Sequence, residues 1–190
     1  MIVEQEKKKI KNKNKKKNTW IYKIFFITFV LALVMGTVAD ATVENLNIGF
    51  AVAILIFIIL IGILFDMIGM SVASADEVVF HARATKKHKG AAEAIRLVKD
   101  AEKVSSVCND VVGDVCGIIS GSVSALIALR IATMLQLPNS MISLGIGAMV
   151  ASLTVGGKAI GKAIAVKNSE IIIGKVGVLI SCIFPVKKKQ

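Results

Sequence analysis

The sequence has little of what a soluble globular domain needs. Its 190 residues include only two prolines, aromatic residues make up 5% of the chain, and no segment is both long and polar enough to fold in water. Hydrophobic residues instead account for 55% of the chain, and the mean hydropathy is +0.72. This balance lies well outside the soluble norm and indicates an integral membrane protein with one membrane domain.

Motifs of several other protein classes are also missing. Cys108, Cys116 and Cys182 have no CxxC spacing, so they suggest neither a disulfide framework nor a zinc site. His81 and His88 stand seven residues apart without an acidic partner in the pattern, which is typical of solvated histidines. The sequence has no catalytic triad pattern or phosphate loop, so we predict that it is not an enzyme. The net charge of +11 comes without aromatic residues interleaved among the basic ones, so nucleic acid is not an expected partner.

The first apolar run follows a lysine-rich head. Residues 1–19 predict a basic cytoplasmic tail, because eight lysines stand in residues 4–18 without hydrophobic periodicity. Residues 20–39 are just long enough to cross the hydrocarbon as an N-terminal anchor. A signal peptide is the alternative, since the Ala-Asp-Ala at 39–41 matches a cleavage motif. The full length of the apolar run favours a retained anchor.

Residues 48–186 are expected to form the main transmembrane domain. Apolar runs predict spans over residues 48–71, 107–129 and 141–155. Lysine and arginine gather between the first two of these spans, where an amphipathic helix is expected, and again after the third, which places both segments in the cytoplasm. The last run, 170–184, contains Lys175 and predicts an interfacial or re-entrant helix. We therefore predict an all-α polytopic bundle of four spans with cytoplasmic amphipathic and juxtamembrane helices, in a bacterial inner (cytoplasmic) membrane with both termini in the cytoplasm.

The third predicted span opens with an amide and two carboxylates, in the stretch NDVVGDVCGIISG from Asn109 to Gly121. At ~100° per residue, the polar and small residues of this stretch share one helical face, which we expect to be buried against protein. An ionised Asp deep in the bilayer costs on the order of 3 kcal/mol, so such an acid normally faces a cavity or a partner. Hard cations such as Mg²⁺ prefer oxygen ligands. Candidate ligands are Asn109, Asp110, Asp114 and Ser120, with Ser71 and Ser74 from the second span.

Two structural alternatives stay open for the same acids. Asp110 and Asp114 could cap the N-terminus of the third span, where the helix dipole favours negative charge. They could instead pair with Lys158 or Lys162 at the inner end of the fourth span. If Lys158 points toward these acids, a network of ion pairs is indicated; if it points away from them, a cation site is.

These residues also resemble a known family, the transmembrane domain of CorB/CorC and cyclin-M (CNNM) magnesium transport proteins, in its short clostridial CorB-like form. FDMIGMSVASADEVVFHA resembles the end of the family's first helix, with Ser74 three residues before Glu77. KGAAEAIRLVKDAEKVSSVCNDVVGDVCGIISG resembles its linking helix and second span, with Asn109 near the characteristic asparagine. VGGKAIGKAIAVKNSEIIIGKVG resembles its Gly-Glu-x-x-Pro-Lys kink and juxtamembrane helix. The resemblance covers roughly residues 48–184.

The resemblance implies a homodimer that binds Mg²⁺, or Co²⁺, on the inward side, through Ser71, Ser74, Asn109 and Gly113. Lys158, however, stands where the family has glutamate, and Gly161 where it has proline. The leading prediction is a divalent-cation binding and transport protein of the lipid bilayer. The alternative is a non-transporting membrane scaffold or partner subunit with intramembrane acid–lysine pairs.

Overall fold

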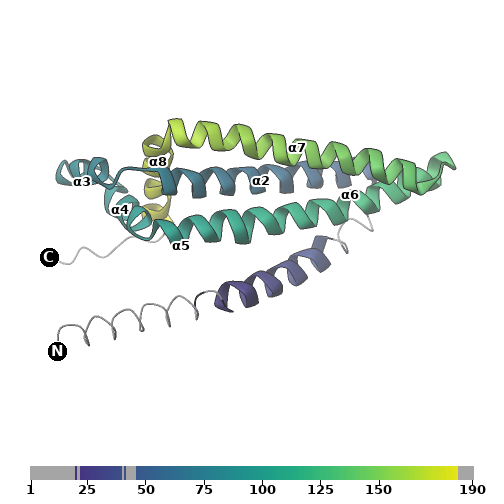
Figure 1. Cartoon of the computed structure of the whole chain (residues 1–190), viewed down its shortest axis with the longest axis horizontal. Coiled ribbons are helices and arrows are strands. Elements are labelled where there is room, and N and C mark those ends of the chain that lie inside the picture. Colours follow the sequence, from purple (N-terminus) through teal and green to yellow (C-terminus); the bar gives the residue numbers. More distant parts are fainter. Residues whose placement is uncertain (1–19, 21, 40, 42–45, 184–190) are drawn as a thin grey trace, which may run out of the picture.

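The computed structural model describes residues 20, 22–39, 41 and 46–183, so the predicted basic tail lies outside the described residues. All regular structure within them is helical (Figure 1). An N-terminal helix, Tyr22–Ala39, comes first. The elements that follow are α2 (Ile48–Ser74), α3 (Glu77–Thr85), α4 (Ala91–Lys99), α5 (Ala101–Ser106), the π-helical η1 (Val107–Gly113), α6 (Asp114–Leu135), α7 (Asn139–Lys167) and α8 (Ser169–Ile183).

Four of the described helices are long and apolar enough to cross a membrane, as predicted. They are Tyr22–Ala39, α2, the unbroken run Ala101–Leu135 that joins α5, η1 and α6, and α7. The last three lie side by side, alternating in direction, and form the body of the bundle (Figure 1). The N-terminal helix touches this body near its end, where Ala39 is buried with Leu55 and Ile59 of α2, but most of its residues are exposed.

Three of these helices, α2, the third span and α7, are longer than the apolar runs that predicted them. The third span was expected over residues 107–129, yet the helix that contains it has 35 residues. At ~1.5 Å per residue this is about 52 Å, which is longer than a hydrocarbon core of roughly 30 Å requires. α7 runs without a break through the glycines that resemble the family's kink. α8, with 15 residues, lies across the end of the bundle beside α3 and α4 (Figure 1) and does not extend along it.

Branched and small residues together hold the third span against α2, where a side chain on Gly62 would come within 2.9 Å of Cys116 Cβ. Val115 and Ile119 are buried among α2 side chains, together with Val123. Asp110 and Asp114 are exposed. The expectation that the small polar face would be buried was therefore wrong for the acids. Ser120 of the same face is buried, whereas the two acids lie along the exposed edge of that face.

A candidate polar site between three membrane helices

A close approach between α2 and the third span begins at a glycine. A side chain on Gly69 of α2 would collide with the amide of Asn109 and would come within 2.9 Å of Cys108 Cβ. Both of those residues belong to η1, a π-helical segment inside an otherwise α-helical span. Such wide turns are rare and often occur at functional sites. The glycine thus lets the π-helical turn lie directly on α2.

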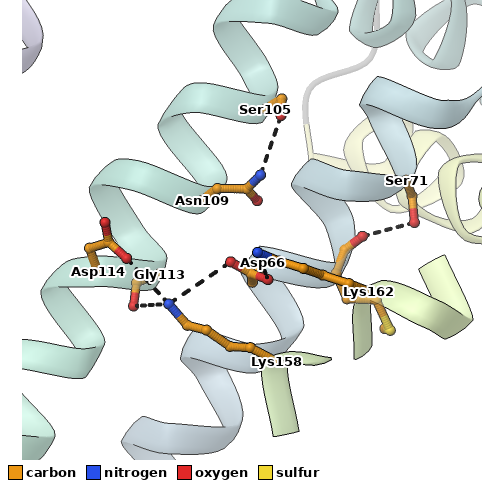
Figure 2. A network of polar contacts seen from close by, with 9 residues as sticks. Asp66, Ser71, Ser105, Asn109, Gly113, Asp114, Lys158 and Lys162 are labelled. Carbon is orange, nitrogen blue, oxygen red and sulfur yellow. Dashed lines mark hydrogen bonds and ion pairs between the residues drawn. The ribbon is translucent and has the colours of Figure 1, made fainter. Parts of the chain in front are cut away.

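Asp66 is the central acid of the site, although the predicted ligands did not include it. It lies on α2 about two turns before the helix ends, and only 3% of its surface is exposed. Its Oδ1 is 3.9 Å from Lys158 Nζ and its Oδ2 is 3.4 Å from Lys162 Nζ (Figure 2). Both lysines come from α7. Asp66 therefore bridges α2 to α7 through two ion pairs inside the bundle.

Lys158 also binds the third span. Its ammonium donates a hydrogen bond to the Gly113 carbonyl at 3.2 Å and another to Asp114 Oδ1 at 3.3 Å (Figure 2). A Cβ on Gly113 would lie 3.5 Å from the amine, which is an ordinary contact distance. The side chain of Lys158 is 18% exposed, whereas that of Asp114 is 65% exposed. One ammonium thus joins oxygen atoms from α2, η1 and α6.

The charges of this cluster balance. Asp66 and Asp114 supply two negative charges, and Lys158 and Lys162 supply two positive charges. An isolated ionised side chain inside a membrane is costly, and mutual pairing is the usual way to lower that cost. The cluster therefore needs no added cation for neutrality.

Two buried oxygens of the site receive no hydrogen bond from any residue that the structure describes. They are Asp66 Oδ2, which has the Lys162 amine at ion-pair distance without a directed bond, and Asn109 Oδ1. The Asn109 amide nitrogen donates to Ser105 Oγ at 3.3 Å, so the side chain is anchored on that side only (Figure 2). Buried polar atoms are nearly always hydrogen-bonded, and exceptions call for an explanation.

The structure brings together three of the predicted ligands, Asn109, Gly113 and Asp114, around Asp66 and the lysines. The other four lie outside this group. Ser71 Oγ donates to the Met67 carbonyl of its own helix at 2.8 Å, and Ser120 Oγ to the Cys116 carbonyl at 2.7 Å. Asp110 accepts from Ser106 Oγ at 2.9 Å, and Ser74 is exposed at the end of α2. In the part of the chain that the structure describes, no group of three or more His, Cys, Asp or Glu side chains could hold a metal.

The cap interpretation of Asp110 and Asp114 is wrong, because the helix that carries them begins at Ala101, more than two turns earlier. The ion-pair interpretation holds for Asp114 with Lys158 but not for Asp110. A signal for Asp66 was present in the sequence. It is the one charge within the long apolar run of α2, and it lies about as far from the C-terminal end of its helix as Lys158 does from the C-terminal end of α7.

Over the described residues the fold is all-helical, with four helices suited to a multi-pass membrane protein and a charged cluster between three of them that is centred on the buried Asp66. Searches of protein-family models, curated proteins and solved structures found no match for this chain.

Proposed function

We propose that the protein is a non-transporting membrane subunit in which an acid–lysine cluster fixes three spans and leaves the outer face of α7 for a partner helix. The observation that carries this proposal is the position of Lys158 Nζ, within 3.2 to 3.9 Å of the Gly113, Asp114 and Asp66 oxygens. The ammonium group of Lys158 thus occupies the position between the acids that a bound metal ion would need.

Electrostatics supports a structural role for the cluster over metal binding. Two unit charges ~4 Å apart interact by about 4 kcal/mol at an effective dielectric constant near 20, and a divalent ion doubles this. A Mg²⁺ ion among the same oxygens would therefore be repelled by roughly 8 kcal/mol from the Lys158 amine alone. Lys162, whose Nζ lies 3.4 Å from Asp66, would add to this repulsion.

The outer face of α7 supports the subunit role. Gly145, Ala148, Ser152, Gly156 and Ala159 lie within about 80° of one another on the helix and are all exposed. A side chain built on Gly145 or Gly156 would meet no atom within 4 Å. Small residues let membrane helices approach closely, and this is a main source of their association. The proposed partner is a second copy of the chain.

The test of this proposal is a magnesium titration of the purified protein in neutral detergent. Thermal unfolding is followed with increasing MgCl₂ and, separately, with NaCl at matched ionic strength. We expect the two salts to give the same transition temperature, because the cluster is already neutral. A rise specific to Mg²⁺ that Asp66→Asn removes would contradict the proposal.

A second candidate function, divalent-cation transport, is favoured by the buried Asn109 Oδ1 that receives no hydrogen bond. A cation such as Mg²⁺ could use that oxygen together with Asp66 and the Gly113 carbonyl, in competition with the Lys158 amine. Lys158→Met should then strengthen Mg²⁺ binding, and Asp66→Asn should abolish Mg²⁺ uptake into proteoliposomes. Asp76→Asn is the matched control, because Asp76 is exposed between α2 and α3 and bonds only locally, to the Val78 amide. Equal Mg²⁺ uptake by vesicles with the parent protein, with Asp66→Asn, with Asp76→Asn and without protein would exclude this function.

A further inference from the structure

A second polar feature lies apart from the charged cluster, at the end of the bundle where α3, α4 and α8 meet (Figure 1). The three helices enclose a pocket of about 500 Å³. Phe80 of α3 and Val178 of α8 contribute apolar walls. By the distribution of lysine and arginine this end faces the cytoplasm, so the pocket would lie near the inner headgroup layer.

The polar lining of this pocket is basic. Arg83, His88, Lys89 and Lys175 line it, and among the described lining residues there is no acid. Arg83 is partly neutralised from outside, since its Nη2 lies 3.9 Å from Glu170 Oε2. Lys89 and Lys175 form no ion pair with a described acid. The two lysines therefore leave positive charge available to an anion.

Backbone contacts hold the walls of the pocket in place. Gly90 has a φ of +79°, and a side chain there would collide with the backbone of Gly177 and Val178. A side chain on Gly177 would in turn meet the Gly90 carbonyl and would come within 3.2 Å of Ala94 Cβ. The start of α4 thus lies directly on α8 through two glycines, so the basic side chains are presented from a rigid frame.

We propose that this pocket binds the headgroup of an anionic phospholipid of the inner leaflet. A phosphate group suits Lys89, Lys175 and the imidazole of His88, while an acyl chain can follow the exposed apolar side chains of α8, such as Ile171 and Leu179. Basic pockets between helices on the cytoplasmic side are a known means of binding anionic headgroups. A free phosphate would use the same lysines but would gain nothing from the apolar walls.

The experiment measures thermal unfolding of the full chain in neutral detergent with three additives in turn: phosphatidylglycerol, phosphatidylcholine and inorganic phosphate. A ligand that binds only the folded state raises the transition temperature in proportion to its occupancy. We expect phosphatidylglycerol to raise it by several degrees, with little change from the other two. The double variant Lys89→Gln/Lys175→Gln should lose most of this rise.

The matched control is Lys86→Gln/Lys167→Gln, which removes the same charge from exposed side chains that do not line the pocket. It should keep the full response to phosphatidylglycerol. If both double variants lose the phosphatidylglycerol-induced rise in transition temperature equally, the proposal is overturned. Nonspecific attraction of the lipid to the positive charge at this end of the bundle would then explain the effect. An equal rise with inorganic phosphate alone would overturn the lipid assignment, since a free anion would then account for the binding.

Discussion

The clearest consequence of the charged cluster is the effect of replacing Asp66 by Asn. The substitution keeps the shape of the side chain but leaves Lys158 and Lys162 without their buried acid. Breaking a buried ion pair by removing one partner typically costs about 3 to 5 kcal/mol. Lys162 is 48% exposed and Lys158 keeps Asp114 and the Gly113 carbonyl, so the lower end applies. We expect Asp66→Asn to lower the free energy of unfolding by about 3 kcal/mol.

The pairing itself is measured by adding Lys158→Met. Met fills nearly the same volume without a charge, so the double variant Asp66→Asn/Lys158→Met should be more stable than the sum of the two single changes predicts. We expect a coupling energy of about 1 to 2 kcal/mol, within the range seen for contacting residues. Asp114→Asn is the matched control, because its side chain is 65% exposed and its loss should cost under ~1 kcal/mol.

The assay is equilibrium unfolding in mixed micelles of a neutral detergent and dodecyl sulfate, followed by circular dichroism. Each of the four proteins of the cycle gives a free energy of unfolding from the same titration. Additive effects of the two changes would refute the conclusion that Asp66 and Lys158 act as a pair. A loss below ~0.5 kcal/mol for Asp66→Asn would show that the cluster does not stabilise the bundle.

Three further predictions test the packing around the cluster and the outer face of α7. Gly69→Val should destabilise the protein by about 1 to 3 kcal/mol in the same titration, because its side chain would enter the space of the Asn109 amide. Asp110→Asn should change stability by less than ~0.5 kcal/mol, since Asp110 is exposed and, among the described residues, accepts a hydrogen bond from Ser106 alone. Gly156→Leu on α7 should lower the fraction of dimers measured by cross-linking in membranes, while leaving monomer unfolding unchanged. An unchanged dimer fraction would exclude this face as the contact.

Much of the fold follows from hydropathy and charge, because each long helix corresponds to an apolar run of sufficient length. The helix ends do not follow in the same way. Hydropathy reports which residues can lie in lipid, whereas helix length depends on hydrogen bonding and continues through polar residues such as those from Ala101 to Ser106. The π-helical turn at η1 also escaped prediction; it lies where Asn109 approaches Gly69, two residues far apart in the sequence.

The site was predicted only in part, for a related reason. Asn109, Gly113 and Asp114 were singled out because they stand together in the sequence, and Lys158 was named as a possible partner of Asp114. Asp66 was missed as a member of the cluster, because it comes from another span and its meeting with Lys158 depends on the relative position of the two helices along the bundle. Oxygen-bearing residue types also do not distinguish a ligand from a group that bonds its own helix, as Ser71 and Ser120 do. Only the packing of the three spans decides which oxygens meet at one point.

The cluster also bears on how the bundle assembles. Before it packs, α2 carries Asp66 alone in an otherwise apolar helix, and α7 carries two lysines at a similar depth. Each charge costs on the order of 3 kcal/mol in a lone helix, even on the most lenient insertion scale. Pairing relieves part of that cost only when α7 lies against α2 in the register that aligns Asp66 with Lys158 and Lys162. A shift of α7 by one turn would separate them, so the same charges that oppose insertion of single helices select one arrangement of the assembled bundle.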